Sequence, residues 1–258
     1  MATKLAFNSY TIRSKLNNPK EVGSTFKQLR DIGFEAVELD LDSLLLQFDA
    51  VDLKGLLNEL GLNAFSAHTG FERLENGIEN ALKSFKILGL EYAVVPTLPN
   101  DRFCKDEEGY LSGTRMLASF GKRMKEDGIK FAYHNHAKEF EKFAGKTAME
   151  IVFNESNWED YLAELDVYWI QNAGGDPEEW LREYRGRMPL VHIKDMGVVS
   201  GKPMTMEVGE GNMNMPSIIE ACREARVEWY IIEQDYCLRD PVQSLAISKA
   251  YLNKLGVS

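Results

Sequence analysis

The 258-residue sequence lacks most features of secreted and membrane proteins. Its three cysteines, Cys104, Cys222 and Cys237, are odd in number and widely spaced, so they predict neither a disulfide framework nor a Cys-x-x-Cys metal pair. Free thiols are typical of a reducing compartment, and we therefore expect a cytoplasmic protein. The segment Met1–Asn8 has no apolar run behind basic residues, so no signal peptide is expected. No stretch approaches about 18 uninterrupted apolar residues, so no membrane span is expected.

Positive charge is also scarce, because 30 Lys and Arg face 40 Asp and Glu, which gives a net charge of −10. Binding to DNA or RNA depends on basic surface that neutralises phosphates, so this balance argues against nucleic acid as a partner. No stretch is rich enough in proline, glycine or serine to divide the chain. Its length suits one large core, and we expect residues 1–258 to form a single domain.

A pattern of helix, glycine and strand recurs along the first half of the chain. Segments of helical period end before Gly33, Gly61, Gly89 and Gly128, and a β-branched or aromatic run follows each glycine. A glycine in the left-handed conformation closes many helices, because it has no Cβ to clash. The first three of these glycines are 28 residues apart, about the length of one βα unit.

Eight strands that alternate with helices predict a parallel sheet, and eight such units predict its closure. The expected strands lie at residues 5–8, 36–39, 62–68, 92–95, 129–136, 162–168, 189–193 and 229–233. An open doubly wound sheet would carry a Gly-x-Gly-x-x-Gly turn after its first strand, where this chain has Asn8-Ser-Tyr-Thr11. The predicted fold is therefore a (β/α)8 TIM barrel of the α/β class.

All four histidines, His68, His134, His136 and His192, fall at the carboxyl ends of expected strands. In a barrel those ends converge on one mouth, where enzymes of this fold place their chemistry. A lone histidine is more often an ordinary hydrogen-bonded residue. Four of them at strand ends favour a functional cluster.

Carboxylates accompany the histidines, because Glu38, Asp166 and Glu233 lie in or at the ends of apolar strands. Acidic residues rarely occupy such positions unless they are paired or bind a metal. We predict that His134, Asp166, His192 and Glu233 surround one divalent cation. A mixed nitrogen and oxygen set suits Mn²⁺, Co²⁺ or Zn²⁺. The alternative is a buried ion-pair network without a metal.

Two glycine-containing segments are weaker signals. Residues 172–177 predict a strand-to-helix turn with Asp176 as N-cap and Pro177 at the first helical position, rather than a phosphate-binding nest. Residues 209–213 lack the Lys-Ser/Thr of a phosphate loop and suggest a loop at the mouth. Lys194 and Asp195 either orient the site or belong to a solvated loop.

Several segments resemble the xylose-isomerase-like sugar phosphate isomerase/epimerase superfamily. They are Leu165-Asp-Val-Tyr-Trp169, Val191-His-Ile-Lys-Asp195, Gly209-Glu-Gly-Asn212 and Ile231-Ile-Glu-Gln-Asp235. The resemblance runs from about residue 3 to residue 256. It implies a TIM barrel and a metal-dependent enzyme that acts on a small sugar or polyol.

The epimerases of that superfamily hold Mn²⁺ or a similar ion with Glu, Asp, His and Glu from strands five to eight. Asp166, His192 and Glu233 match the last three, whereas His134 stands where the first glutamate would be. The two glutamates of the epimerases exchange a proton beside the substrate carbonyl. With one of them replaced, a one-base elimination, as in inosose or 3-keto-sugar dehydratases, becomes an alternative to isomerisation or epimerisation.

The resemblance predicts metal-assisted enolisation, with Mn²⁺ favoured and Co²⁺, Mg²⁺ or Zn²⁺ as alternatives. Glu233 is the expected base, with His136 and Lys194 as further catalytic residues. The residues expected to bind substrate are Glu38, His68, Asn135 and Glu139, of which Glu139 is also a second candidate acid/base.

The expected partner is a small sugar or polyol, and the absence of a cationic cluster favours an unphosphorylated one. Association into a homo-oligomer stays open. Two further hypotheses are a sugar-binding barrel without catalysis and an endonuclease IV-type enzyme for damaged DNA. The acidic charge disfavours the second of these.

Overall fold

The computed structural model describes residues 4–155, 157 and 159–258 of the chain. Eight parallel strands close into a barrel in the order β1-β12-β9-β8-β5-β4-β3-β2. The strands are β1 (Lys4–Asn8), β2 (Ala36–Asp40), β3 (Asn63–His68), β4 (Tyr92–Val95), β5 (Lys130–His134), β8 (Leu162–Asp166), β9 (Leu190–Ile193) and β12 (Trp229–Ile232). The predicted TIM barrel is confirmed. Residues 1–3, on which part of the signal-peptide expectation rests, lie outside the described residues.

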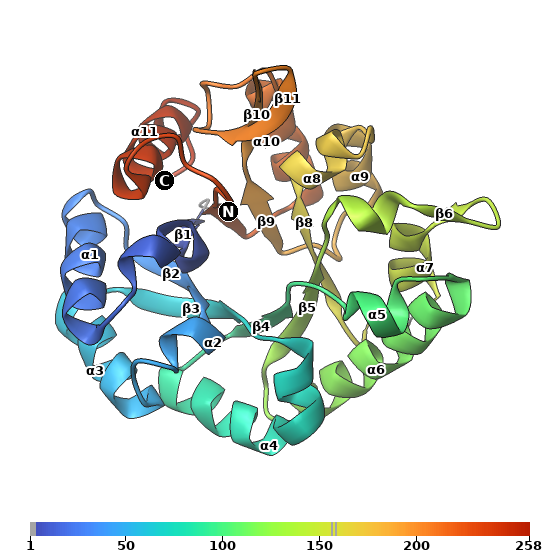
Figure 1. Cartoon of the computed structure of the whole chain (residues 1–258), viewed down its shortest axis with the longest axis horizontal. Helices are drawn as coiled ribbons and strands as arrows, with labels where there is room; N and C mark the ends of the chain where they lie inside the picture. Colours follow the sequence, from blue (N-terminus) through green and yellow to red (C-terminus); the bar gives the residue numbers. More distant parts are fainter. Residues whose placement is uncertain (1–3, 156, 158) are drawn as a thin grey trace.

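Helices form a ring around these strands (Figure 1). The longer ones are α1 (Pro19–Asp31), α3 (Ala50–Leu60), α4 (Phe71–Leu88), α6 (Glu107–Glu126), α7 (Ala148–Asn154), α9 (Pro177–Glu183), α10 (Met215–Ala225) and α11 (Pro241–Lys254). Short helical segments follow several strands: η1 (Ser9–Lys15), α2 (Leu41–Leu44), α5 (Asn100–Phe103), η2 (Ala137–Phe140) and α8 (Val167–Asn172). Among the described residues, no helix combines the length and the apolar character that crossing a membrane requires.

The helix ends follow the local chemistry that the sequence predicts. Gly61 and Gly89 close α3 and α4 with φ of 65° and 74°, a region in which a side chain would be strained. At the start of α9, the Asp176 side chain accepts a hydrogen bond from the Glu178 backbone, and Pro177 is the first helical residue. The predicted N-cap Asp176 and first helical residue Pro177 are therefore confirmed, but the turn joins α8 to α9 rather than a strand to a helix.

Two predicted strand ends differ from the structure by two residues, and two hairpins were not predicted. The sixth barrel strand ends at Asp166 rather than at residue 168, because the Asp166 side chain accepts a hydrogen bond from Trp169 N and starts α8. The fifth strand ends at His134, and His136 lies in the loop beyond it. Two hairpins, β6 (Lys142–Phe143) with β7 (Lys146–Thr147) and β10 (Asp195–Val199) with β11 (Lys202–Met206), were not predicted.

The barrel interior is apolar at the amino ends of the strands and polar at their carboxyl ends. Near the amino ends, Phe65 stacks on Trp229 with ring centroids 3.7 Å apart. Successive side chains of a strand point to opposite faces, so residues two apart share the interior. In β8 this alternation gives both Glu164 and Asp166 complete burial. The polar end therefore concentrates buried charge at the mouth.

The close approach of Gly121 in α6 to the loop before β8 predicts a large effect of a substitution on stability. A Cβ added to Gly121 of α6 would lie 1.8 Å from the carbonyl oxygen of Asp160, so Gly121→Ala must move the backbone. We expect it to lower the free energy of unfolding by about 1–3 kcal/mol or more, measured by urea denaturation followed by circular dichroism.

Gly55 of α3 is the matched control, because a Cβ there has no neighbour within 4 Å. Gly55→Ala should raise the free energy of unfolding by up to about 1 kcal/mol, since alanine is the better helix former. Equal effects of the two substitutions would contradict the packing described here.

Candidate metal centre at the mouth of the barrel

Two groups of buried side chains at the carboxyl ends of the strands have the composition of metal sites. The upper cluster, nearer the mouth, consists of His134, Asp166, His192 and Glu233. The lower cluster consists of His68, His134, Glu164 and His192. In each cluster, one ligand atom from every residue lies within 4.8 Å of the others.

The upper cluster contains the four residues predicted from the sequence as metal ligands. Nδ1 of His192 lies 2.9 Å from Oε2 of Glu233, and Nε2 of His134 lies 3.7 Å from Oδ2 of Asp166. All four side chains are buried, with Glu233 the most exposed at 4%. Two imidazoles and two carboxylates on four strands are a donor set that fits a divalent cation.

The lower cluster contains Glu164, a residue that the sequence analysis missed. Its Oε2 lies 2.7 Å from Nε2 of His68, 3.0 Å from Nδ1 of His134 and 3.3 Å from Nε2 of His192. The signal for this residue was present, because Glu164 stands two positions before Asp166 and so shares its side of the strand.

The two clusters use opposite ring nitrogens of the same two histidines. Nδ1 of His134 lies against Glu164, and Nε2 of His192 lies 2.7 Å from Oε2 of Glu38. A neutral imidazole has one N–H and one free nitrogen, so an N–H that donates to a carboxylate leaves the other nitrogen available to a metal. Glu38 and Glu164 therefore prepare both histidines for an ion in the upper cluster.

The two histidines differ in charge. Burial lowers the pKa of His134 well below its usual range, so that ring is neutral and Nε2 is free. Burial also disfavours the charged form of His192, but Glu164, Glu233 and Glu38 outweigh it and hold the pKa of His192 well above its usual range. His192 must therefore release a proton when it binds a metal.

Lys194 directly follows β9, and its side chain lies inside the upper cluster. Its Nζ is 2.7 Å from Oδ2 of Asp166, 2.5 Å from Oε2 of Glu233 and 3.0 Å from Oδ2 of Asp235. Burial disfavours its charge, but these carboxylates outweigh burial and raise the pKa of Lys194 well above its usual range. The side chain, which is 1% exposed, is thus a buried ammonium ion.

Three residues of the loop after β5 have distinct environments. His136 lines the mouth, and burial lowers its pKa to about 3, which makes it neutral. Asn135 Oδ1 accepts a hydrogen bond from Asp166 N at 2.9 Å. Glu139 is fully buried and accepts hydrogen bonds from Tyr133 Oη and His136 N. Asn135 and Glu139 therefore hold the loop in place.

The Asp195 side chain holds the loop at residues 209–213 through hydrogen bonds to its backbone. Its carboxylate accepts hydrogen bonds from the backbone N–H groups of Gly209, Gly211 and Met213 at 2.9–3.1 Å. Lys194 and Asp195 are each 1% exposed, so the alternative of a solvated loop is wrong.

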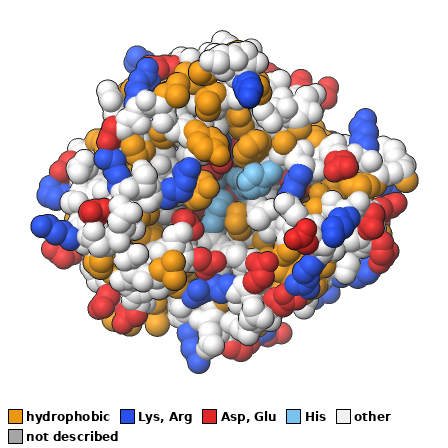
Figure 2. All heavy atoms as spheres, viewed as in Figure 1, with side chains coloured by type: hydrophobic (Ala, Val, Ile, Leu, Met, Phe, Trp, Pro, Cys, Tyr) orange, Lys and Arg blue, Asp and Glu red, His pale blue; other side chains and the backbone are white. Residues whose placement is uncertain are grey.

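The mouth encloses a cavity of about 220 Å³. Its lining residues are Tyr10, Asp40, His68, Pro96, Thr97, His134, His136, Glu233 and Asp235. Figure 2 looks into this hollow and shows histidine side chains at its floor. Among the described residues, the lining combines imidazoles and carboxylates and includes no lysine or arginine, so it suits a small polar ligand without a negative charge.

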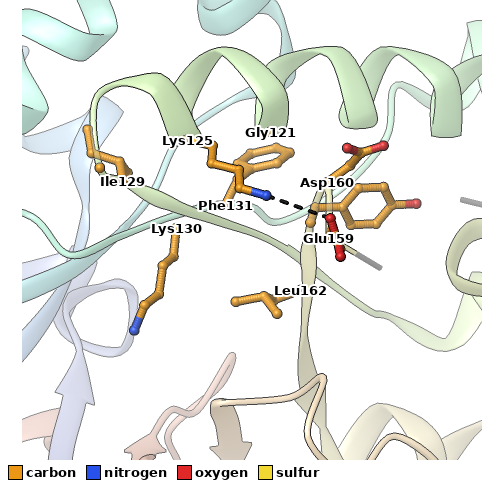
Figure 3. A pocket seen from close by; sticks show the side chains of 10 residues that line it. Gly121, Lys125, Ile129, Lys130, Phe131, Glu159, Asp160 and Leu162 are labelled. Carbon is orange, nitrogen blue, oxygen red and sulfur yellow. Dashed lines mark ion pairs between the residues drawn. The ribbon is translucent and has the colours of Figure 1, made fainter. Parts of the chain in front are cut away.

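A larger cavity of about 500 Å³ lies at the opposite end of the barrel, between α6 and the starts of β5 and β8 (Figure 3). Its charged side chains include Lys125 and Glu159, whose Nζ and Oε2 are 4.0 Å apart. Phe131 and Leu162 contribute apolar surface to it. It does not gather several buried titratable groups as the mouth does, and it is the weaker candidate for a catalytic site.

Comparisons with known proteins agree with this geometry. Residues 26–255 match the family model of the xylose isomerase-like TIM barrel. The structure is similar to a sugar phosphate isomerase/epimerase from Parabacteroides distasonis ATCC 8503, with a TM-score of 0.82 and 23% identity over 100% of this chain and 96% of that one.

Two further solved structures each cover 98% of this chain and have 98% of their own length covered. They are the IolI protein with a bound zinc atom, with a TM-score of 0.73 and 17% identity, and a D-tagatose 3-epimerase-like protein, with a TM-score of 0.72 and 19% identity. No functionally curated protein matches the sequence. At these identities the structural likeness shows the fold.

Glu164 gives a test of the arrangement of the two clusters. In Glu164→Gln the amide oxygen can still accept a hydrogen bond, but the negative charge that holds the His134 N–H and makes the ring a stronger ligand is lost. We expect divalent-metal affinity to fall about 10- to 100-fold, measured by isothermal titration calorimetry of Mn²⁺ into chelator-treated protein.

Glu139→Gln is the control, because Glu139 is equally buried but belongs to neither cluster. It should leave the affinity unchanged. Complete loss of binding in Glu164→Gln alone would instead make Glu164 a direct ligand and move the ion to the lower cluster.

Proposed function

Because the chain belongs to the xylose isomerase-like TIM barrel family, we propose that it is a divalent-metal-dependent isomerase or epimerase of a keto- or aldo-sugar or polyol. The observation that carries the proposal is the upper cluster of two imidazoles and two carboxylates, of which His134 and Glu233 line the mouth cavity. The likeness to a sugar phosphate isomerase/epimerase and to the zinc-bound IolI protein supports it.

The proposed ligands of the cation are His134, Asp166, His192 and Glu233. When bound, a divalent cation supplies Lewis acidity that polarises a carbonyl oxygen and offsets the negative charge of an enediolate. Mn²⁺ is the proposed ion, with Co²⁺, Mg²⁺ or Zn²⁺ as alternatives.

Glu233 is the proposed base. It lines the cavity, and although burial disfavours its charge, Lys194 and His192 hold the pKa of Glu233 well below its usual range. The carboxylate is therefore ionised at neutral pH and can remove a proton from the carbon beside the substrate carbonyl.

A neutral imidazole supports the second proton transfer. His136 lines the same cavity, and burial lowers its pKa to about 3, so a neutral ring is present there to hydrogen-bond a substrate hydroxyl. We assign His136 as the second acid/base and His68, which also lines the cavity, as a substrate-binding residue. Lys194 is a further candidate donor.

The remaining residues expected to bind substrate contact protein instead. Oε2 of Glu38 accepts hydrogen bonds from Asn8 and His192, and Glu38 is fully buried. Asn135 and Glu139 are likewise buried and hydrogen-bonded to protein atoms. We therefore propose that these three residues position the site rather than contact the sugar.

The charge of the cavity favours an unphosphorylated substrate. Asp40, Glu233 and Asp235 line it, and no lysine or arginine does so among the described residues. Apart from the proposed metal ion, the lining offers a phosphate group no partner of opposite charge.

A one-base elimination is the second candidate. Strand β5 ends in His134, so the metal ligands include a carboxylate on β8 and one on β12 but none on β5. Glu233 alone could then remove the proton, with the ammonium group of Lys194 as the proton donor to a departing hydroxyl. Dehydration of an inosose or 3-keto-sugar would have this requirement.

Glu233→Gln is the direct test of the base. An amide cannot accept the proton, so hydrogen exchange should fall at least about 100-fold while the fold is retained. The measurement is deuterium uptake from D₂O into a panel of keto-sugars and inososes, followed by NMR. The same spectra separate an isomer from a dehydrated product.

Glu159→Gln, at the far end of the barrel, is the control and should exchange like the unaltered protein. Exchange at the full rate in Glu233→Gln would remove Glu233 from the role of base.

Removal of the metal should abolish the same exchange. Protein treated with a chelator, with its metal content checked by elemental analysis, is expected to lose activity and to recover it when Mn²⁺ is added. Full activity with less than about one metal ion per hundred chains would reject the metal-dependent mechanism.

A further inference from the structure

The ammonium group of Lys194 occupies the space between two proposed metal ligands. Its Nζ lies 2.7 Å from Oδ2 of Asp166 and 2.5 Å from Oε2 of Glu233. Both oxygens belong to the upper cluster. The lysine is therefore a cation already bound by the carboxylates that a metal would use.

A metal ion bound to the same two oxygens would lie close to this ammonium group. A metal–oxygen bond is about 2 Å long, so an ion bound to both oxygens would lie within about 5 Å of the present Nζ. Two positive charges at that separation repel strongly in a buried site, where water screens them little. The ammonium group therefore weakens binding of the ion unless it moves away.

A third carboxylate could hold the Lys194 ammonium group if it left the other two. Its third partner, Asp235 Oδ2, is 3.0 Å from Nζ, lies outside both clusters and lines the mouth cavity. The Trp169 ring is also near, with its centroid 5.8 Å from Nζ. A small rotation of the lysine side chain can keep the Asp235 contact while it releases Asp166 and Glu233.

We propose that Lys194 is an internal counter-cation of the upper cluster, which competes with the divalent ion for Asp166 and Glu233 and moves to Asp235 when the ion binds. Without a metal, Lys194 stabilises carboxylates that would otherwise be buried and unpaired. With a metal, it lies at the mouth cavity beside Asp235, where it faces substrate. The inference rests on the metal site of the proposed function but not on its reaction.

The experiment compares Lys194→Met with the unaltered protein. Methionine has a similar length and no charge, so it removes the competitor. Mn²⁺ titrated calorimetrically into chelator-treated Lys194→Met should bind about tenfold more tightly or better. The thermal midpoint of metal-free Lys194→Met should fall, and Mn²⁺ should raise it by more than in the unaltered protein.

Lys138→Met is the matched control, because Nζ of Lys138 also lies near the mouth but is bound by Thr97, Leu98 and Asn100. Its Mn²⁺ affinity should stay within about threefold of the unaltered protein. Equal tightening in both lysine variants would reduce the effect to general charge and overturn the proposal.

Asp235→Asn tests the movement itself. It removes the second partner of Lys194, so it should weaken Mn²⁺ binding in the presence of the lysine. In the Lys194→Met background the same substitution should have a much smaller effect, which a double-mutant cycle measures. An equal loss in both backgrounds would show that Asp235 acts on the ion directly and would overturn the movement.

Lys194→Arg covers the case in which Lys194→Met does not fold without metal. Arginine keeps the charge, and its planar fork holds carboxylates firmly, so Mn²⁺ should bind no more tightly than in the unaltered protein. Tighter binding by Lys194→Arg would overturn the competition. Recovery of folded Lys194→Met only when Mn²⁺ is present would support it.

The two proposals fail in different ways. If neither the unaltered protein nor Lys194→Met takes up Mn²⁺ or Zn²⁺, the metal site of the proposed function fails together with this inference. If the unaltered protein binds Mn²⁺ and Lys194→Met binds it no more tightly, only this inference fails.

Discussion

The structure must keep carboxylates, imidazoles and an ammonium group buried together at one end of an otherwise apolar barrel. Isolated ions in such a place would be very costly, so each must find a partner of opposite charge or a hydrogen bond. Glu164 achieves this with three imidazoles, and Lys194 with three carboxylates. The arrangement of the site follows from this requirement.

Closure of the barrel supplies the partners. Most strands carry only a few polar side chains at or just beyond their carboxyl ends, too few for the charges of any one strand to be neutralised by that strand alone. Glu38 of β2 reaches His192 of β9 across 154 positions of sequence, and the distance between their nearest atoms is 2.7 Å. The apolar stack of Phe65 on Trp229 fills the opposite end of the barrel. The packed amino end and the charged mouth thus belong to one framework. Its rigidity keeps the proposed metal-binding side chains at fixed positions relative to one another.

Much of the fold could be predicted because its signals are local. Gly61 and Gly89 mark helix ends through backbone conformation, and Asp176 with Pro177 marks a helix start through a side-chain hydrogen bond. The missed boundary at Asp166 has the same kind of cause, since its side chain caps the next helix. The hairpin of β10 and β11 had no comparable signal, because its strands lack the apolar alternation of the barrel strands.

The sequence by itself determined the alternation of strands and helices and the placing of histidines at strand ends, because periodicity, capping and residue type act over a few neighbours. Only the tertiary structure decided that Glu164 lies among three histidines and that Lys194 lies between Asp166 and Glu233. Those contacts depend on the angle and stagger at which distant strands meet, and the energy of a buried charge depends on every group around it.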